Sequence, residues 1–222
     1  MKLALQTLAS AVAGTLFFAT LLCVPAGTVN YWQAWVFIAV FIGTTIGPSL
    51  YLAVRHPDAL ARRLNAGKET RPIQQLVMCA LMASIIGTLV LSALDRRFGW
   101  SPVPVWVVIA GDVVVGVALL AAQLVVIQNN FAAANITVEA GQPVISTGLY
   151  AVVRHPMYLC ALIMMVATPP ALGSYWGLIP VAGAVPVLVA RILDEEQMLR
   201  AELPGYIEYT HTVRHRLIPG LW

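Results

Sequence analysis

Two short stretches in the last third of the sequence carry ionisable side chains beside long apolar segments. One is Arg154-His155-Pro156-Met157-Tyr158, and the other is Asp194-Glu195-Glu196, which follows the last apolar segment. An ionisable group beside a membrane-length apolar segment is costly to place, so it marks a functional site by default. A carboxylate can pair with a cationic ligand group, and an arginine can hold a carboxylate by paired hydrogen bonds. We therefore expect the chemistry of this protein in its last third.

Pro156 predicts the start of a helix. Proline has no backbone N–H and disfavours helical backbone at the residue before it, His155. The N-terminus of such a helix has unpaired amide groups that an anionic ligand group can bind. Further along, Arg191 precedes Glu195 by four residues, so their side chains can share one helix face. Anchoring at lipid headgroups remains an equally open explanation for Arg154 and His155.

The composition indicates an integral membrane protein. Apolar residues make up 59% of the 222 residues and charged residues only 10%, whereas an ordinary soluble domain carries about 25% charged residues. The mean hydropathy is +0.81. A chain of this length divided into membrane helices leaves no room for a separate soluble domain.

Six apolar segments are long enough to be membrane helices, which predicts an all-α, polytopic helix bundle. They span residues 7–25, 31–54, 73–94, 104–128, 156–172 and 175–192. The last two are short and separated only by Leu172-Gly173-Ser174, so we expect a C-terminal helical hairpin whose first arm ends at Pro169-Pro170.

The positive charges predict the orientation of this bundle. With six spans, all 13 lysines and arginines except Arg96 and Arg97 lie on one side of the membrane. The positive-inside rule makes that side cytoplasmic and places both termini there, in a multi-pass protein. Orientation thus explains the net charge of +3, and we expect no nucleic-acid partner. The polar stretches 55–72 and 129–155 and the tail from 193 lie on this side, where they can build one site.

The sequence predicts no metal site. His211 and His215 are four residues apart, but no Glu completes an H-E-x-x-H pattern and no third ligand is evident. The three cysteines stand singly in apolar segments, which gives neither metal-ligand spacing nor a disulfide framework. The chain also lacks the G-x-G-x-x-G pattern, so a soluble dinucleotide-binding fold is excluded.

Several motifs, taken in order, resemble the isoprenylcysteine carboxyl methyltransferase and phospholipid methyltransferase superfamily. They are Gly148-Leu149-Tyr150, Arg154-His155-Pro156-Met157-Tyr158, Glu195-Glu196-x-x-Leu199, Tyr206-x-x-Tyr209 and Arg216-Leu217-Ile218-Pro219. The resemblance implies a division into residues 1–128, with four N-terminal spans, and residues 129–222, with a cofactor loop, the helical hairpin and a C-terminal cytoplasmic helix.

The resemblance implies an integral membrane enzyme that binds S-adenosylmethionine in a cytoplasmic pocket. It also implies that this enzyme takes its methyl acceptor, a lipophilic small molecule or a prenylated substrate, from the bilayer, so membrane lipids are expected partners. The cofactor contacts it implies are Asn135, Gln142, Pro143, Val144, Ile145, Tyr150, His155, Pro156, Met157, Tyr158 and Glu195. It implies that Arg191 faces the acceptor, and we expect Arg154 and Glu196 to complete the catalytic set. The reaction we expect is carboxyl O-methylation of an isoprenylcysteine-like substrate.

Three other functions stay open. The chain can be a phospholipid amine N-methyltransferase, which would need a base at the acceptor site. It can be an NADPH-dependent membrane sterol-type reductase, in which Arg214 and Arg216 would bind the 2′-phosphate. It can also be a non-catalytic membrane scaffold. The sequence predicts no oligomeric state.

Overall fold

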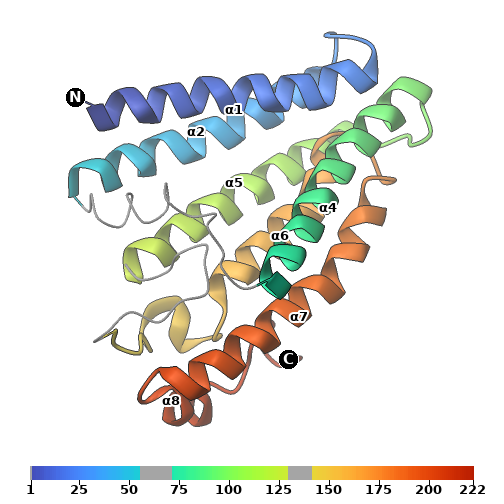
Figure 1. The fold of residues 1–222 in the computed structure, drawn as a ribbon. Coiled ribbons are helices and arrows are strands. Elements are labelled where there is room, and N and C mark those ends of the chain that lie inside the picture. The colour runs from blue at the N-terminus through green and yellow to red at the C-terminus, as the bar shows by residue number, and fades with distance from the viewer. Residues whose placement is uncertain (1, 56–71, 130–141) are drawn as a thin grey trace.

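The computed structural model describes residues 2–55, 72–129 and 142–222, and all regular structure in these ranges is helical (Figure 1). The described helices are α1 (Lys2–Ala26), α2 (Trp32–Arg55), α4 (Pro72–Phe98), α5 (Val105–Gln128), α6 (Pro156–Ala171), α7 (Leu178–Glu202) and α8 (Tyr206–Thr212), together with a 3₁₀ turn, η1 (Gly148–Ala151). Each of the six segments predicted from hydropathy corresponds to one helix. The all-α prediction is therefore confirmed over the described residues.

Four of the described helices are long and apolar enough to cross a membrane. The qualifying stretches are Ala9–Ala26, Trp32–Tyr51, Ile73–Phe98 and Val105–Gln128. Helix α6 is apolar but has only 16 residues, and α7 carries its charged residues in its second half. The four helices indicate an integral membrane protein, and the fifth and sixth spans stay a prediction.

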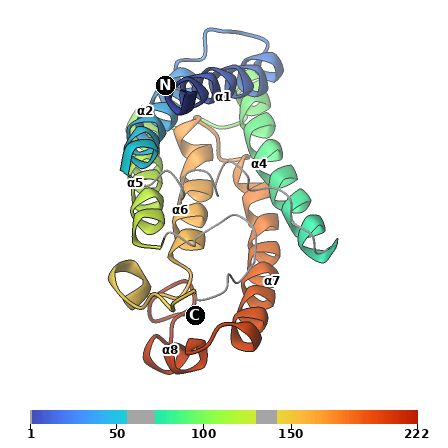
Figure 2. The same cartoon turned by 60° about the vertical axis from the view of Figure 1, so that its left-hand side comes forward.

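The arms of the predicted hairpin pack more closely on earlier helices than on each other. Helix α6 lies along α5 and α7 lies along α4, while α1 and α2 pair at one side of the bundle (Figure 2). A Cβ atom added to Gly111 of α5 would lie 2.7 Å from the backbone nitrogen of Ala171 in α6. Glycine at this position is what allows α5 and α6 to approach so closely.

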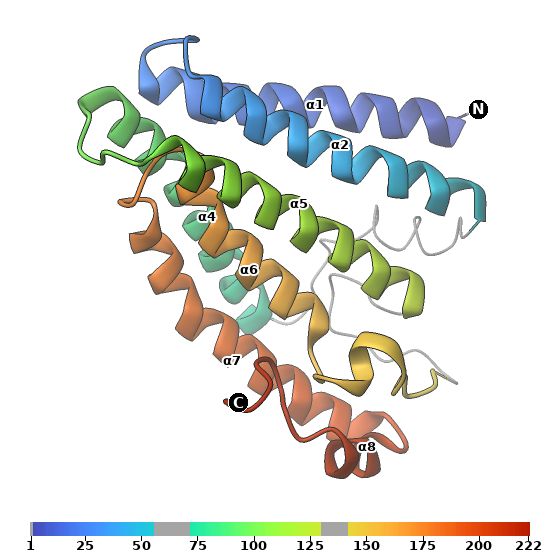
Figure 3. The same cartoon turned by 180° about the vertical axis from the view of Figure 1, so that it is seen from behind.

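One end of the bundle is held together by buried polar contacts between its loops. The carboxylate of Asp95 accepts hydrogen bonds from the Ser174 hydroxyl at 2.5 Å and from the Ser101 backbone N–H at 2.7 Å. The Tyr31 hydroxyl donates to the Leu172 carbonyl at 2.6 Å. These contacts fix the α1–α2, α4–α5 and α6–α7 connections together. The opposite end, where η1, α8 and the C-terminus gather, is where the two motif stretches lie (Figure 3).

Candidate functional site

The motif beginning at Arg154 is held in place by the C-terminal segment. The backbone N–H of Arg154 donates to the His215 carbonyl and that of His155 to the Arg216 carbonyl, both at 2.9 Å. Helix α6 then begins at Pro156 with His155 as its N-cap residue, so the predicted helix start is confirmed. The segment after α8 therefore positions the residues that lead into α6.

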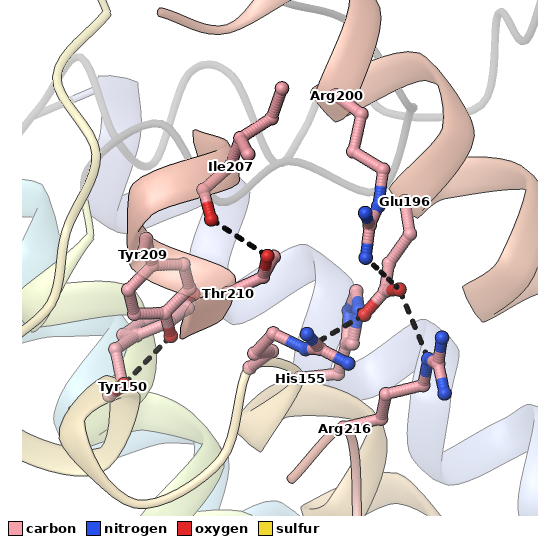
Figure 4. Close-up of polar contacts among 9 residues, drawn as sticks. Tyr150, His155, Glu196, Arg200, Ile207, Tyr209, Thr210 and Arg216 are labelled. Carbon is pink, nitrogen blue, oxygen red and sulfur yellow. Dashed lines mark hydrogen bonds and ion pairs between the residues drawn. The ribbon is translucent and has the colours of Figure 1, made fainter. Parts of the chain in front are cut away.

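Glu196 lies at the centre of a cluster of basic side chains (Figure 4). Its carboxylate oxygens lie 2.9 Å from Arg154 Nε, 3.0 Å from Arg216 Nε, 3.4 Å from His155 Nε2 and 3.8 Å from Arg200 Nη2. The Arg154 contact is a close ion pair without the alignment of a hydrogen bond. The side chains of Arg154 and Glu196 are only 5% and 4% exposed, so the pair is shielded from water.

The basic neighbours keep Glu196 ionised. Burial alone raises the pKa of this carboxyl, but the hydrogen bonds from His155 and Arg216 and the charge of Arg154 together hold the pKa below its ordinary value. Both carboxylate oxygens are engaged by these groups. Glu196 therefore holds the cluster together and has little capacity for a further cationic partner.

A second network runs through Glu195, the neighbouring acid. The Tyr158 hydroxyl donates to Glu195 Oε2 at 2.6 Å and accepts from Arg191 Nε at 2.8 Å. Arg191 Nη1 donates to Gln74 Oε1 at 2.8 Å, and the Gln74 amide nitrogen donates to the Asp194 carboxylate. Arg191 is buried and Glu195 is half-buried. The network joins α4, α6 and α7, and Tyr158 bridges the Arg191 and Glu195 side chains that the sequence placed on one face.

Tyr158 also contacts the first cluster. Its ring stacks on the His155 ring with centroids 5.6 Å apart, and the Arg191 guanidinium lies 5.8 Å from the Tyr158 ring centroid. The His155 ring thus touches Glu196 on one side and Tyr158 on the other. The two networks are therefore adjacent parts of one polar region.

Tyr150 in η1 belongs to the same region. Its hydroxyl accepts from the Asn129 amide at 3.2 Å, and its carbonyl accepts from the Tyr209 hydroxyl of α8 at 2.7 Å (Figure 4). Burial raises the pKa of Tyr150, the Asn129 bond lowers it, and the negative charge of Glu195 raises it further. The bond from Tyr209 shows that the loop before α6 packs against α8, which follows α7.

The turn that carries Tyr150 depends on a glycine. Gly148 has φ of +61°, and a Cβ atom there would lie 2.5 Å from the Gln128 side chain. The Gln128 side chain in turn accepts from the Leu149 backbone N–H at 3.1 Å. Only glycine combines this left-handed backbone with so close an approach.

The other predicted cofactor residues lie beside these networks. Residues 142–145 have no regular secondary structure, and Val144 packs on a buried cluster formed by Leu203, Tyr206, Tyr209 and Val213. Met157 lies in the first turn of α6 next to Tyr158. Asn135 lies outside the described residues. The structure therefore brings Tyr150, His155 and Glu195 to one end of the bundle, as the hypothesis requires.

Sequence reasoning missed three contributors to this region. Gln74, Tyr209 and Arg216 each make a side-chain contact to a predicted site residue. The sequence feature that could have indicated Gln74 is its polar side chain at the start of an apolar segment. Arg216 and Tyr209 lie within motifs that were quoted, but their partners are 20 and 59 residues away in sequence.

Part of the chain matches a known protein family. Residues 106–201 match the sequence model of the Isoprenylcysteine carboxyl methyltransferase (ICMT) family. The matched residues include all of η1 and α6 and nearly all of α5 and α7. Comparison with curated proteins gives no match. The match includes three of the five motifs from which the resemblance was inferred, those beginning at Gly148, Arg154 and Glu195, and it confirms that resemblance.

Proposed function

We propose, on the premise that residues 106–201 form an isoprenylcysteine carboxyl methyltransferase family region, that this membrane methyltransferase uses S-adenosylmethionine to methylate the carboxylate of a lipophilic, isoprenylcysteine-like acceptor. The observation that carries the proposal is the chain of hydrogen bonds from Glu195 through Tyr158 to Arg191. The Glu195 carboxylate and the Arg191 guanidinium thus both contact the hydroxyl of Tyr158. Such an arrangement can hold a cationic cofactor group and an anionic acceptor group next to each other.

The donor and acceptor groups of the region fit the ionic ends of S-adenosylmethionine. Glu195 is half-buried and accepts a hydrogen bond from Tyr158 through Oε2, and we propose that its carboxylate also accepts from an ammonium group. The backbone N–H groups of Met157 and Tyr158 lie in the first turn of α6 and have no intrahelical partner, so they can bind a carboxylate. When bound, the cofactor supplies a methyl group activated by its sulfonium.

Arg191 fits the acceptor side of the reaction. A carboxylate acceptor is ionised at pH 7 and needs no base, so its binding requires chiefly a well-oriented cation. The guanidinium of Arg191 is buried and held by contacts from two other helices, which strengthens its attraction for an anion. An amine acceptor, as in phospholipid N-methylation, would instead need a base and would be repelled by this charge. These features favour a carboxylate.

The contacts of the C-terminal arginines do not favour a nicotinamide cofactor. Arg216 is engaged by Glu196 and lies 5.3 Å from the Trp222 ring centroid, while Arg214 is exposed. A 2′-phosphate would require several basic groups directed to one point. The distribution of lysines and arginines along the sequence supports the expected topology, with both termini cytoplasmic, and we propose that the acceptor enters from the bilayer.

Calorimetry of the purified protein in detergent tests the cofactor assignment. Wild-type protein is expected to bind S-adenosylmethionine and not NADPH, and Glu195→Gln is expected to weaken S-adenosylmethionine binding about 10- to 100-fold, since a charge-assisted contact is lost. The control is Glu208→Gln, which removes an exposed acid from α8. Preferential binding of NADPH, or equal loss in both variants, would overturn the assignment.

The acceptor assignment is tested separately. Arg191→Ala is expected to abolish methylation while leaving S-adenosylmethionine affinity nearly unchanged. Arg214→Ala, at an exposed position, is the matched control and should retain activity. If Arg191→Ala loses cofactor binding together with activity, the acceptor role is refuted.

A further inference from the structure

Gln74 is a polar side chain buried where an exposed one would be expected. It lies in the first turn of α4 with a relative exposure of 0%, whereas its neighbours Ile73 and Leu76 are 57% and 66% exposed. Gln75, the next residue, is also exposed. A buried amide is retained at low cost only when its hydrogen bonds are made. The burial of the Gln74 side chain therefore requires hydrogen-bond partners in the protein.

Both ends of this amide contact charged groups on α7. The oxygen accepts from Arg191 Nη1 at 2.8 Å, and the nitrogen donates to the Asp194 carboxylate. A neutral amide serves a cation and an anion at once, because it carries an acceptor and a donor on one planar group. A carboxylate at this position would repel Asp194, and an ammonium would repel Arg191. Glutamine is thus the side chain that fits both partners.

The contact with Gln74 fixes the direction of the Arg191 guanidinium. Arg191 is held through Nε by the Tyr158 hydroxyl of α6 and through Nη1 by Gln74 of α4, each at 2.8 Å. Two contacts from two different helices determine both the position and the rotation of a planar guanidinium. Loss of the contact to Gln74 removes one of these two contacts, so the guanidinium is held less firmly in this orientation.

We propose that Gln74 is a positioning residue for the acceptor site, which acts by holding the Arg191 guanidinium in the orientation that receives the acceptor carboxylate. This inference rests on the proposed function, in which Arg191 binds the acceptor. Gln74 makes no contact with the reacting groups. Its effect passes through Arg191 and therefore falls on acceptor binding while cofactor binding at Glu195 is retained.

The test compares Gln74→Leu with Gln75→Leu in acceptor binding and in kinetics. An unreactive isoprenylcysteine analogue that keeps the free carboxylate is titrated into the purified protein, and KM and kcat are measured with a reactive acceptor. Gln74→Leu is expected to weaken analogue binding and raise the acceptor KM about 10- to 100-fold, the range for a hydrogen bond to a charged group. The affinity for S-adenosylmethionine should change less than about twofold, and Gln75→Leu, at the exposed neighbouring position, should change analogue binding much less than Gln74→Leu.

A double-mutant cycle shows whether Gln74 acts through Arg191. In an Arg191→Lys background the guanidinium is absent, so adding Gln74→Leu is expected to cause almost no further loss of analogue affinity. Additive losses would overturn the inference. Gln74→Glu keeps a polar side chain at this position and serves as the second test variant if Gln74→Leu does not fold. Its carboxylate competes for Arg191, so it too must weaken the analogue; unchanged binding would refute the proposal.

The outcomes separate this inference from the proposed function. If wild-type protein binds the analogue and Arg191→Ala abolishes that binding, but Gln74→Leu and Gln74→Glu bind normally, the positioning role alone fails. If wild-type protein binds S-adenosylmethionine but no anionic lipophilic acceptor, both fail. Equal weakening of cofactor and analogue in Gln74→Leu and Gln74→Glu would identify Gln74 as a general structural residue and overturn the inference.

Discussion

Glu195 and Glu196, the adjacent acids near the end of α7, are expected to respond differently to the same substitution. Glu196→Gln should destabilise the protein strongly, whereas Glu195→Gln should lower its stability much less and weaken cofactor binding. The reason lies in their surroundings. Glu196 is the carboxylate that neutralises a buried cluster of basic side chains, while Glu195 is half-buried.

The size of the effect follows from the burial of the partners. Arg154 is only 5% exposed, so its charge would be left buried without a counter-ion, a change that costs about 3–5 kcal/mol. Arg216 and Arg200, with side chains 29% and 44% exposed, are screened by water and add at most about 1 kcal/mol each. Glu195→Gln removes the charge from one hydrogen bond to Tyr158 and should cost about 1 kcal/mol.

The assay is reversible unfolding of each variant in mixed micelles, followed by loss of helical signal as denaturing detergent is added. Glu196→Gln should unfold at a clearly lower detergent fraction than Glu195→Gln, with a difference of at least about 2 kcal/mol between the two unfolding free energies. Glu208→Gln should unfold like the wild type. Equal unfolding free energies for Glu195→Gln and Glu196→Gln would refute the assignment of Glu196 as the centre of a buried ionic cluster.

Three further results are expected. The pKa of Glu196 is lowered in the folded protein from its ordinary value of 4.5. Its contribution to the unfolding free energy is therefore complete above that pH and is lost as the pH falls through the lowered pKa. Unfolding measured between pH 6 and pH 3 should show this loss of stability in the wild type and a smaller loss in Glu196→Gln. Tyr209→Phe removes the 2.7 Å bond to the Tyr150 carbonyl and should cost about 1 kcal/mol of unfolding free energy, and calorimetry should show cofactor affinity reduced a few-fold. Gly148→Ala forces a side chain into a left-handed backbone 2.5 Å from Gln128 and should cost about 1–3 kcal/mol; wild-type cofactor affinity in this variant would contradict the role of the η1 turn.

Hydropathy predicted the helices closely because membrane thickness sets their length. The segments 31–54 and 104–128 correspond to α2, Trp32–Arg55, and α5, Val105–Gln128. The start of α6 was predicted to the residue because Pro156 fixes its own backbone and disfavours helix before it. Length alone predicted less about α6 and α7, because short or charged helices do not carry the signal of a membrane span.

Side-chain partners were predicted less well because they depend on how helices are rotated against each other. Successive residues on a helix point about 100° apart, so Glu195 and Glu196 face different neighbours although they are adjacent. The sequence could place Arg191 and Glu195 on one face, but not Gln74 between Arg191 and Asp194, since 117 residues separate Gln74 from Arg191. Motif spacing indicates which residues matter, while packing decides what each one does.

We propose that this region transfers a methyl group to the carboxylate of a lipophilic acceptor. The most direct measurement is to incubate membranes containing the protein with methyl-labelled S-adenosylmethionine and an isoprenylcysteine acceptor, extract the lipids and treat the extract with base. If the acceptor is a carboxylate, we expect lipid-soluble label that base releases, because the product is an ester. Membranes with Arg191→Ala should give no such label. Base-stable label, which indicates methylated nitrogen, or equal ester label with Arg191→Ala would contradict the account.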